Sequence, residues 1–325
     1  MEIRRISVVV FALVALIAAI LFLNNNQTAS VKIGVIEPMA HIAVSDITQG
    51  ILQEINGNDK HKIEVLVRNA SGDKTLIPQI VSQYRDQDVD IYVPIFTSTS
   101  QIAASTIKHK PIVFAAVTDP VAAGVIKNSK SPQSNVTGVS DLWPIDAQFQ
   151  LIKRLQPAIK TIGILFDPND PSSSITMPLV RSSADKYKIV LLEKPVSSAT
   201  GIAEALPSLD GKVDALFTAN DTTVTQSLPA LVVFSIQNKI PLYAGDYSSV
   251  KRGAISAVGQ SYEGVGREAG EMIIAILDGQ LVSDLPVRYT DGGDIYINAE
   301  AARKMNVKIP SGVLNKAKQV YETIE

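Results

Sequence analysis

Beyond residue 30 the chain alternates between short, continuously apolar segments and longer segments in which apolar residues recur at helical spacing. A short run without a polar face is typical of a strand buried on both sides of a parallel sheet. These runs predict strands at 32–36, 63–68, 91–95, 112–117, 161–166, 189–192, 215–218, 241–244 and 254–258. The longer segments predict helices, for example at 45–55, 77–84, 148–155, 224–237 and 264–277. The alternation therefore predicts an α/β fold in which right-handed crossovers connect parallel strands.

The pattern also repeats along the chain. KIGVIEP at 32–38 matches TIGILFDP at 161–168, where Gly34 and Gly163 are offset by 129 residues (163 minus 34). VDIYVPIFT at 89–97 matches VDALFTANDT at 213–222 with an offset of 124 (213 minus 89), and Pro111 matches Pro241 with an offset of 130 (241 minus 111). Three matches in the same order predict two similar, doubly wound parallel-sheet lobes.

Polar loops follow five of the predicted strands. The apolar run at 112–117, for instance, breaks off into Thr118, Asp119 and Pro120. The five loops are rich in Ser, Thr, Asn or Asp and lie at 96–101, 118–120, 167–174, 219–223 and 245–249. These residue types also cap helices, so each residue has two interpretations, a ligand contact or a cap. Because ligands of open α/β sheets bind at the carboxyl ends of strands, the set of loops favours a small-molecule site between the lobes.

Composition excludes several classes of function. A net charge of −2 gives no reason to expect a nucleic-acid partner. The chain has no cysteine and three histidines, none at metal-ligand spacing, so we expect no metal site and no cofactor. No GxSxG, P-loop or paired catalytic acid motif is present, which argues against an enzyme. Gly264, Gly266 and Gly270 form a GxGxxxG whose spacing does not fit a dinucleotide fingerprint and instead predicts close helix packing.

The N-terminus has the features of a targeting segment. Arg4 and Arg5 precede an uncharged run at 6–23, which a polar stretch follows. Its 18 residues are long for the core of a signal peptide and about the minimum for spanning a bilayer. Residues 1–30 are therefore expected to form either a signal peptide or a helix that anchors the chain in the membrane. In both cases the rest of the chain is extracytoplasmic, because the positive charges stay in the cytoplasm.

Several segments together resemble a known family. They are IVFAAVTDPVAAGVI at 112–126, NVTGVSDLWPI at 135–145, IGILFDPNDPSS at 162–173, ALFTANDTTV at 215–224 and IPLYAGDYSSVKRGAISAVGQSYEGVGREAGEM at 240–272. With them the chain resembles the solute-binding proteins of ABC transporters, close to the tryptophan and tyrosine transport type. The resemblance implies a periplasmic-binding-protein-like (type I) fold, in which a multi-segment hinge joins the two lobes. It also implies partnership with an ABC permease.

The resemblance further implies where the chain crosses between lobes. Lobe 1 is expected to comprise 31–141 and 262–288, and lobe 2 to comprise 142–261 and 289–325. The crossovers are then at 141–144, 260–263 and 289–295. Trp143, the only tryptophan, is expected either to line the cleft or to pack at the hinge.

An amino-acid-like ligand, with an aromatic side chain as one option, needs donors for its carboxylate and an acceptor for its ammonium group. Ser98, Thr99 and Ser100 precede a predicted helix, where hydroxyls and free amides can hold an anion, and Thr118 can add a contact. Asp221 and Asp246 are candidates for the ammonium. The full set of candidate ligand-binding residues is Ser98, Thr99, Ser100, Thr118, Asp119, Asp141, Ser172, Ser173, Asn220, Asp221 and Asp246.

The expected mechanism is capture of a small solute by hinge closure, followed by delivery to the permease. Two alternatives remain at this point. The same fold serves in membrane-anchored ligand sensors, and an enzyme could use the same cleft.

Overall fold

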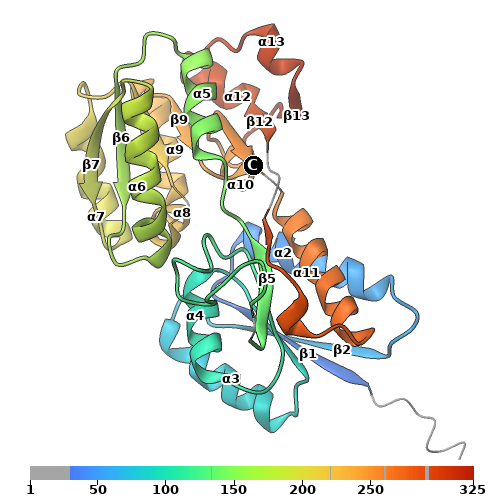
Figure 1. Cartoon of the computed structure of the whole chain (residues 1–325). Coiled ribbons are helices and arrows are strands. Elements are labelled where there is room, and N and C mark those ends of the chain that lie inside the picture. The colour runs from blue at the N-terminus through green and yellow to red at the C-terminus, as the bar shows by residue number, and fades with distance from the viewer. Residues whose placement is uncertain (1–29, 133, 220, 260, 290–292) are drawn as a thin grey trace, which may run out of the picture.

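The chain forms two α/β lobes, which the computed structural model describes at residues 30–132, 134–219, 221–259, 261–289 and 293–325 (Figure 1). The predicted membrane anchor or signal peptide lies outside the described residues. No helix within them is long and apolar enough to cross a membrane. The lower lobe in Figure 1 is lobe 1 and the upper is lobe 2.

Lobe 1 is a six-stranded parallel sheet covered on both faces. Its elements are β1 (Val31–Glu37), α2 (Ile42–Asn56), β2 (Ile63–Asn69), α3 (Ile77–Asp86), β3 (Ile91–Pro94), α4 (Thr97–Thr106), β4 (Ile112–Ala115), β5 (Val136–Ser140), α11 (Tyr262–Leu277) and β11 (Arg288–Tyr289). The strand order is β11-β5-β4-β3-β1-β2. Apolar residues of α2 and α11 form a core on one face, and those of α3 and α4 form a core on the other.

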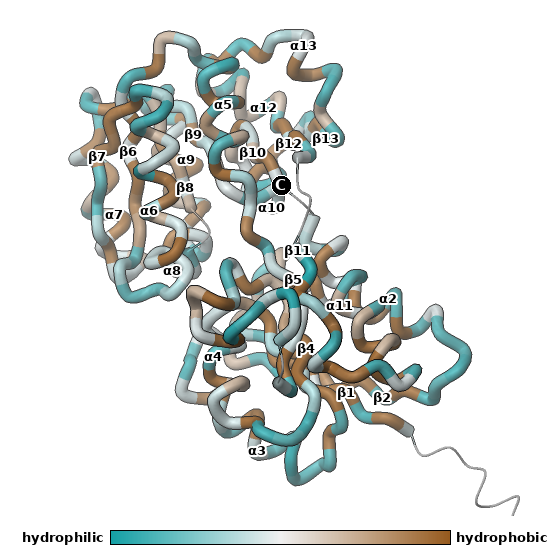
Figure 2. The backbone as a smooth tube through the Cα atoms, viewed as in Figure 1, coloured by the Kyte–Doolittle hydropathy of each residue, from teal (hydrophilic) through white to brown (hydrophobic). Residues whose placement is uncertain are grey.

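Lobe 2 repeats this arrangement. Its elements are α5 (Ile145–Leu155), β6 (Thr161–Phe166), α6 (Pro171–Lys186), β7 (Val190–Pro195), α7 (Ala199–Ala205), β8 (Ala215–Thr218), α8 (Thr222–Gln226), α9 (Leu228–Asn238), β9 (Leu242–Ala244), α10 (Tyr247–Lys251), β10 (Ser256–Gly259), β12 (Asp294–Asn298), α12 (Ala299–Lys304), α13 (Ser311–Leu314) and β13 (Ala317–Tyr321). Its parallel sheet has the order β7-β6-β8-β9. That order matches β2-β1-β3-β4 of lobe 1, so the predicted repeat is confirmed. In Figure 2 apolar colour lies on the strands and on the helices that pack against them.

The chain passes between the lobes three times. It leaves lobe 1 between β5 and α5, returns between β10 and α11, and leaves again between β11 and β12 (Figure 1). Tyr289 pairs with Ser140 in the sheet of lobe 1, one residue beyond the expected boundary at 288. The hinge therefore consists of several segments, as the resemblance implied.

Two local predictions were wrong, and a third strand is present but pairs antiparallel. The helix expected at 224–237 is two helices, α8 and α9, because Pro229 lacks an amide hydrogen and the break at Ser227 accommodates it. The strand expected at 112–117 ends at Ala115, because Ala116 takes a positive φ of 59°. The strand expected at 254–258 is β10, which pairs antiparallel with β12. The strand β10 runs towards a crossover between the lobes and β12 runs away from one, so the two neighbouring strands point in opposite directions.

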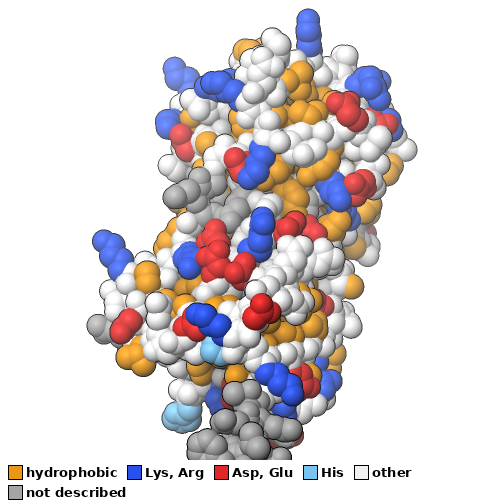
Figure 3. All heavy atoms as spheres, turned by 90° about the vertical axis from the view of Figure 1, so that its right-hand side faces the viewer, with side chains coloured by type: hydrophobic (Ala, Val, Ile, Leu, Met, Phe, Trp, Pro, Cys, Tyr) orange, Lys and Arg blue, Asp and Glu red, His pale blue; other side chains and the backbone are white. Residues whose placement is uncertain are grey.

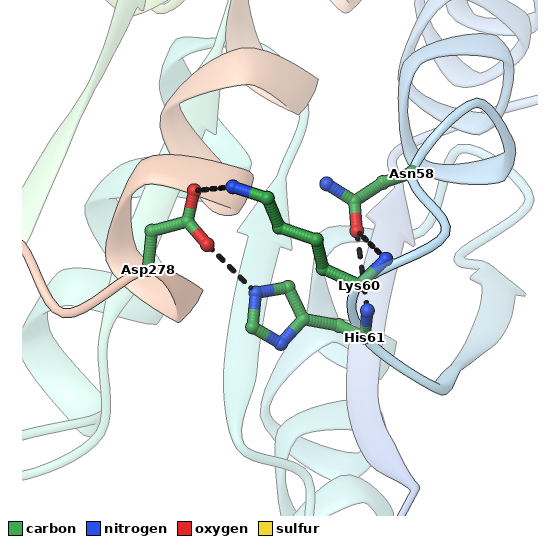
Figure 4. A network of polar contacts seen from close by, with 4 residues as sticks. All are labelled: Asn58, Lys60, His61 and Asp278. Atoms are coloured by element: carbon green, nitrogen blue, oxygen red, sulfur yellow. Dashed lines mark hydrogen bonds and ion pairs between the residues drawn. The ribbon is translucent and has the colours of Figure 1, made fainter.

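Glycines hold α11 against α2, as the GxGxxxG spacing predicted. A Cβ on Gly266 would lie 2.1 Å from the Ile47 carbonyl oxygen, and one on Gly50 would lie 2.2 Å from the Glu263 carbonyl oxygen. The two backbones are thus in direct contact. At the far end of α11, Asp278 accepts hydrogen bonds from Lys60 and His61, which fasten the helix to the loop before β2 (Figure 4).

Candidate functional site

A cavity with about 430 Å³ of empty space lies between the two lobes. Lobe 1 contributes Met39, Ala43, Phe96, Thr97, Ser98, Ala116, Thr118, Asp141 and Tyr262, and lobe 2 contributes Ser172, Asp221, Thr222 and Thr225. Most of these residues lie at the carboxyl ends of strands or at the helix starts that follow them. This is where ligands bind in open α/β sheets.

The lobes meet across this cavity. The Ser172 hydroxyl lies 3.4 Å from the Thr97 hydroxyl oxygen, and the side-chain amide of Gln226 donates to the Met39 sulfur at 2.6 Å. Both contacts join a residue of lobe 2 to one of lobe 1. Figure 3 shows the face that lies on the right in Figure 1, on which acidic and basic side chains lie side by side rather than in large regions of one sign. The two lobes are therefore in contact across the cavity in this structure.

Helix N-termini provide hydrogen-bond donors at the cavity. Helix α4 begins at Thr97, and its N-cap residue, Phe96, makes no side-chain capping bond. Ser98, in the first turn, adds a hydroxyl to the cavity wall. Free amides in the first turn of a helix, together with the helix dipole, form an anion site. This end of α4 is suited to a carboxylate group.

Two residues beside this helix have strained backbones. Phe96 has a φ of 68° and Ala116 a φ of 59°, a region that residues with a Cβ rarely adopt. Both follow the last residues of neighbouring strands and line the cavity. Non-glycine residues with positive φ cluster at ligand sites, where the surrounding structure holds them.

Asp141 follows β5 and contributes a carboxylate to the cavity. Its Oδ1 atom is buried and has no hydrogen-bond partner. Burial raises the pKa of Asp141 to about 7, and a hydrogen bond from the Thr118 hydroxyl opposes the rise. The negative charge of nearby Asp246 also raises the pKa of Asp141. This carboxylate is therefore poorly solvated and still has an oxygen free to accept a hydrogen bond.

Asp221 contributes a second carboxylate, from lobe 2. It caps α8, accepting from the Val224 amide at 2.8 Å, and it also accepts from the Asp167 amide at 2.6 Å and the Ser173 hydroxyl at 3.1 Å. Burial raises the pKa of Asp221 to about 6, although these hydrogen bonds lower it. Asp221 is thus both a helix cap and a cavity residue.

The apolar wall of the cavity comes from lobe 1. Phe96 and Tyr262 pack edge to face, with ring centroids 6.1 Å apart, and Met39 and Ala43 lie at the start of α2. None of the four was among the predicted contact residues, although Phe96 begins the predicted loop at 96–101. Phe96 could have been found, since it separates a predicted strand from the Ser/Thr cluster, whereas no local signal marks Tyr262.

The structure brings five predicted site residues together and leaves five others outside the cavity. Ser98, Thr118, Asp141, Ser172 and Asp221 line it, whereas Thr99, Ser100, Asp119, Ser173 and Asp246 do not. Asn220 lies outside the described residues.

Most of the five outside the cavity bond to their own loops. The Ser100 hydroxyl donates to the Phe96 carbonyl at 2.8 Å, and Asp119 accepts from the Val121 and Ala122 amides at 3.0 Å each. Asp246 caps α10, accepting from the Ser249 amide at 2.9 Å and the Ser248 hydroxyl at 2.6 Å. The helix-cap interpretation therefore describes Asp246.

Trp143 lies in the first crossover. It is buried and packs against Phe217 of lobe 2 at 5.6 Å between ring centroids. It does not line the cavity, so of its two expected roles the hinge-packing one fits. Among the described residues, no group of three or more His, Cys, Asp or Glu side chains is placed to hold a metal ion.

Comparisons with known proteins agree with this geometry. Residues 32–321 match the family model described as ABC transporter substrate binding protein. A tyrosine-binding protein of Clostridioides difficile (strain R20291) is 31% identical over 291 residues, covering 88% of this chain and 84% of that protein.

Two solved structures are similar along nearly their whole length. An ABC domain from Streptococcus pneumonia in complex with L-Trp is 31% identical, with a TM-score of 0.85, covering 90% of this chain and 100% of that one. The ligand-free, open structure of a substrate-binding protein with adhesive properties from Clostridium difficile is 30% identical. Its TM-score is 0.71, and the match covers 90% of this chain and 99% of that one.

Proposed function

This chain belongs to the family of ABC transporter substrate-binding proteins, and on that premise we propose that it captures an amino acid with an aromatic side chain in the interlobe cavity. Proteins of this family bind a small solute, work with an ABC permease and are not enzymes. The relatives that bind tyrosine and L-Trp support an aromatic ligand.

The observation that carries the proposal is the division of the cavity into three chemically different parts. Uncapped amides and Ser98 at the start of α4 suit the ligand carboxylate. Asp141 and Asp221 suit its ammonium group, since each is a buried carboxylate that a cation would stabilise. Phe96, Tyr262 and Met39 form a wall for an aromatic ring. Thr118 and Ser172 are the remaining predicted contacts, one from each lobe.

Burial of the ring supplies enough free energy for useful affinity. An aromatic side chain buries about 150–250 Å², worth about 4–6 kcal/mol at about 25 cal/mol per Å². Micromolar affinity corresponds to about 8 kcal/mol, so the polar contacts need to add only a modest surplus over the cost of association.

The arrangement of the lobes supports binding by closure. The two solved structures have nearly the same identity to this chain and cover the same share of it, yet the TM-score is higher for the L-Trp complex than for the open form. Since identity and coverage are matched, the placement of the lobes is the natural source of the difference. A ligand that touches both lobes would stabilise this closed form.

We further propose that the chain is extracytoplasmic, as substrate-binding proteins of ABC importers are, and that it presents the solute to a permease. Residues 6–23 would hold it to the membrane if the N-terminal segment is not cleaved.

Isothermal titration calorimetry with the 20 standard L-amino acids tests the proposal. We expect micromolar or tighter binding of L-tryptophan or L-tyrosine, and at least tenfold weaker binding of their D-isomers, because α4 and the carboxylates fix the stereocentre. Small-angle scattering should show compaction on binding. The absence of heat with every amino acid would refute the proposal, and so would strong binding without compaction.

A further inference from the structure

The interlobe cavity contains two carboxylates and no basic side chain among its described lining residues. The carboxylates come from opposite sides of the cavity. Asp141 lies at the end of β5 in lobe 1, and Asp221 lies at the start of α8 in lobe 2. Closing the lobes therefore brings two acidic groups into one small, poorly hydrated space.

The groups around Asp141 do not compensate its charge. They include its own backbone amide, the Thr118 hydroxyl, the carboxylate of Asp246 at the start of α10, and the Tyr262 ring at the start of α11, while the basic His41 and Arg252 lie on the far side of Asp246 and do not act on Asp141 directly. Of the four groups around Asp141, one is acidic and the other three are neutral. The unpartnered Oδ1 atom of Asp141 is consequently the group in this cavity that most lacks a ligand.

Asp221 is in a similar position on lobe 2. Its hydrogen-bond donors are two backbone amides and a hydroxyl, all neutral. The charged group that faces it is Asp170, at the start of α6, which raises the pKa of Asp221 further. Asp167 also lies close, bonded through its side chain to Thr223. No cation offsets this acidic group among the residues described around it.

We propose that Asp141 and Asp221 form an electrostatic gate that makes closure of the lobes conditional on a cationic group in the cavity. Ionised and without a cation, the two carboxylates oppose closure, because closure removes them further from water. An ammonium group between the two carboxylates offsets their negative charges and so permits closure. This inference rests on the proposed function, since it concerns the same cavity. It adds that the gate rejects ligands of the right shape that lack a positive charge.

Protonation of the two carboxylates should permit closure of the lobes without a ligand. We expect water to reach these carboxylates more readily in the open form, and their pKa values to lie closer there to the ordinary value for Asp, about 3.9. Burial in the closed form raises the pKa values to about 7 for Asp141 and about 6 for Asp221. The closed form therefore binds protons more tightly. Closure of the empty protein should increase as the pH falls from about 7 to about 4, by up to about tenfold per pH unit for each carboxylate.

The experiment measures closure separately from binding. The natural chain has no cysteine, so one engineered cysteine in each lobe can carry a dye pair, and energy transfer then reports the distance between the lobes of the full-length chain. We expect the empty wild type to be open at pH 8 and to shift towards the closed form at pH 5. Asp141→Asn should raise the closed-to-open ratio of the empty protein at pH 8 at least tenfold. Asp221→Asn, which keeps one oxygen for the capping bond from the Val224 amide and gives up the bond from the Asp167 amide, should act in the same direction.

Ligand analogues test the selectivity of the gate. At pH 8, 3-indolepropionate, which is tryptophan without its ammonium group, should not close the wild type but should close Asp141→Asn. The exposed carboxylates Asp86, in lobe 1, and Asp210, in lobe 2, provide controls. Asp86→Asn and Asp210→Asn should leave the pH dependence unchanged.

Two outcomes would overturn the gate: constant closure of the empty wild type between pH 5 and pH 8, or an Asp141→Asn variant that behaves like the wild type. These outcomes do not depend on which solute binds. If no amino acid binds but empty closure follows pH as described, the proposed ligand is wrong and the gate stands.

Discussion

The two lobes have the same order of parallel strands but present different chemistry to the cavity between them. Lobe 1 supplies the apolar and aromatic wall, which includes Phe96 and Tyr262, together with both strained backbone positions. Lobe 2 supplies only hydroxyls and one carboxylate. The repeated fold thus presents an apolar wall from one lobe and only polar side chains from the other.

This difference indicates an order of events. A ligand in the open form gains most from lobe 1, because apolar burial is the largest favourable term and α4 offers amides on the same lobe. In the proposed mechanism lobe 2 adds its contacts on closure, and those contacts include the carboxylate of Asp221. We therefore expect lobe 1 to determine affinity and lobe 2 to determine whether the bound state closes.

The largest expected effect is on the stability of lobe 1, at the contact between α11 and α2. Gly266→Ala should lower the free energy of unfolding by about 3 kcal/mol or more, because the new methyl group would lie 2.1 Å from the backbone of α2. Gly312→Ala is the control, since nothing lies within 4 Å of its Cβ position. Urea unfolding of both variants measures the difference. Equal stabilities would mean that the contact between α2 and α11 is not as tight as described.

The next effect compares the two walls of the cavity. Phe96→Ala should weaken binding of the aromatic amino acid about 100-fold, or about 3 kcal/mol, because it removes ring contact in a buried site. Thr225→Ala, on the wall of lobe 2, should weaken binding less than about fivefold, since a single neutral hydrogen bond contributes about 1 kcal/mol. Calorimetry on both variants provides the comparison. Similar losses would remove the distinction between the lobes.

The third prediction concerns matched positions of the repeat. A Cβ on Gly34 in β1 would lie 2.6 Å from the Tyr84 ring, whose hydroxyl is fixed by hydrogen bonds of 2.7 and 2.8 Å to two carbonyl oxygens. At Gly163 in β6 the nearest atom, 2.9 Å away, is the end of the Leu216 side chain, which can rotate. Gly34→Ala should therefore cost about 2–3 kcal/mol of stability and Gly163→Ala about 1 kcal/mol.

Thermal unfolding of the two glycine variants ranks these costs. The opposite ranking would show that the Tyr84 ring moves away from the new methyl group more easily than its two hydrogen bonds suggest.

The site could be predicted only in part, for reasons that particular residues illustrate. Thr118 and Asp221 were found because an apolar run ends just before them, and strand ends converge in a parallel sheet. Thr99 and Ser100 follow Ser98 directly, but each step along a helix turns the side chain by about 100°, so these two lie inside lobe 1. Composition cannot distinguish the three, whereas packing of α4 against the sheet does.

By itself, the sequence determined the alternation of strands and helices, the repeat and the close helix contact at Gly266, because apolar runs, spacing and glycines act locally. Tertiary structure decided which polar residues face the cavity and which cap helices. It also decided that Tyr262 meets Phe96, 166 residues earlier in the chain (262 minus 96). The environment of Asp141 arises only when distant segments exclude water from it. Desolvation is a property of the assembled cavity, and for that reason no local pattern records it.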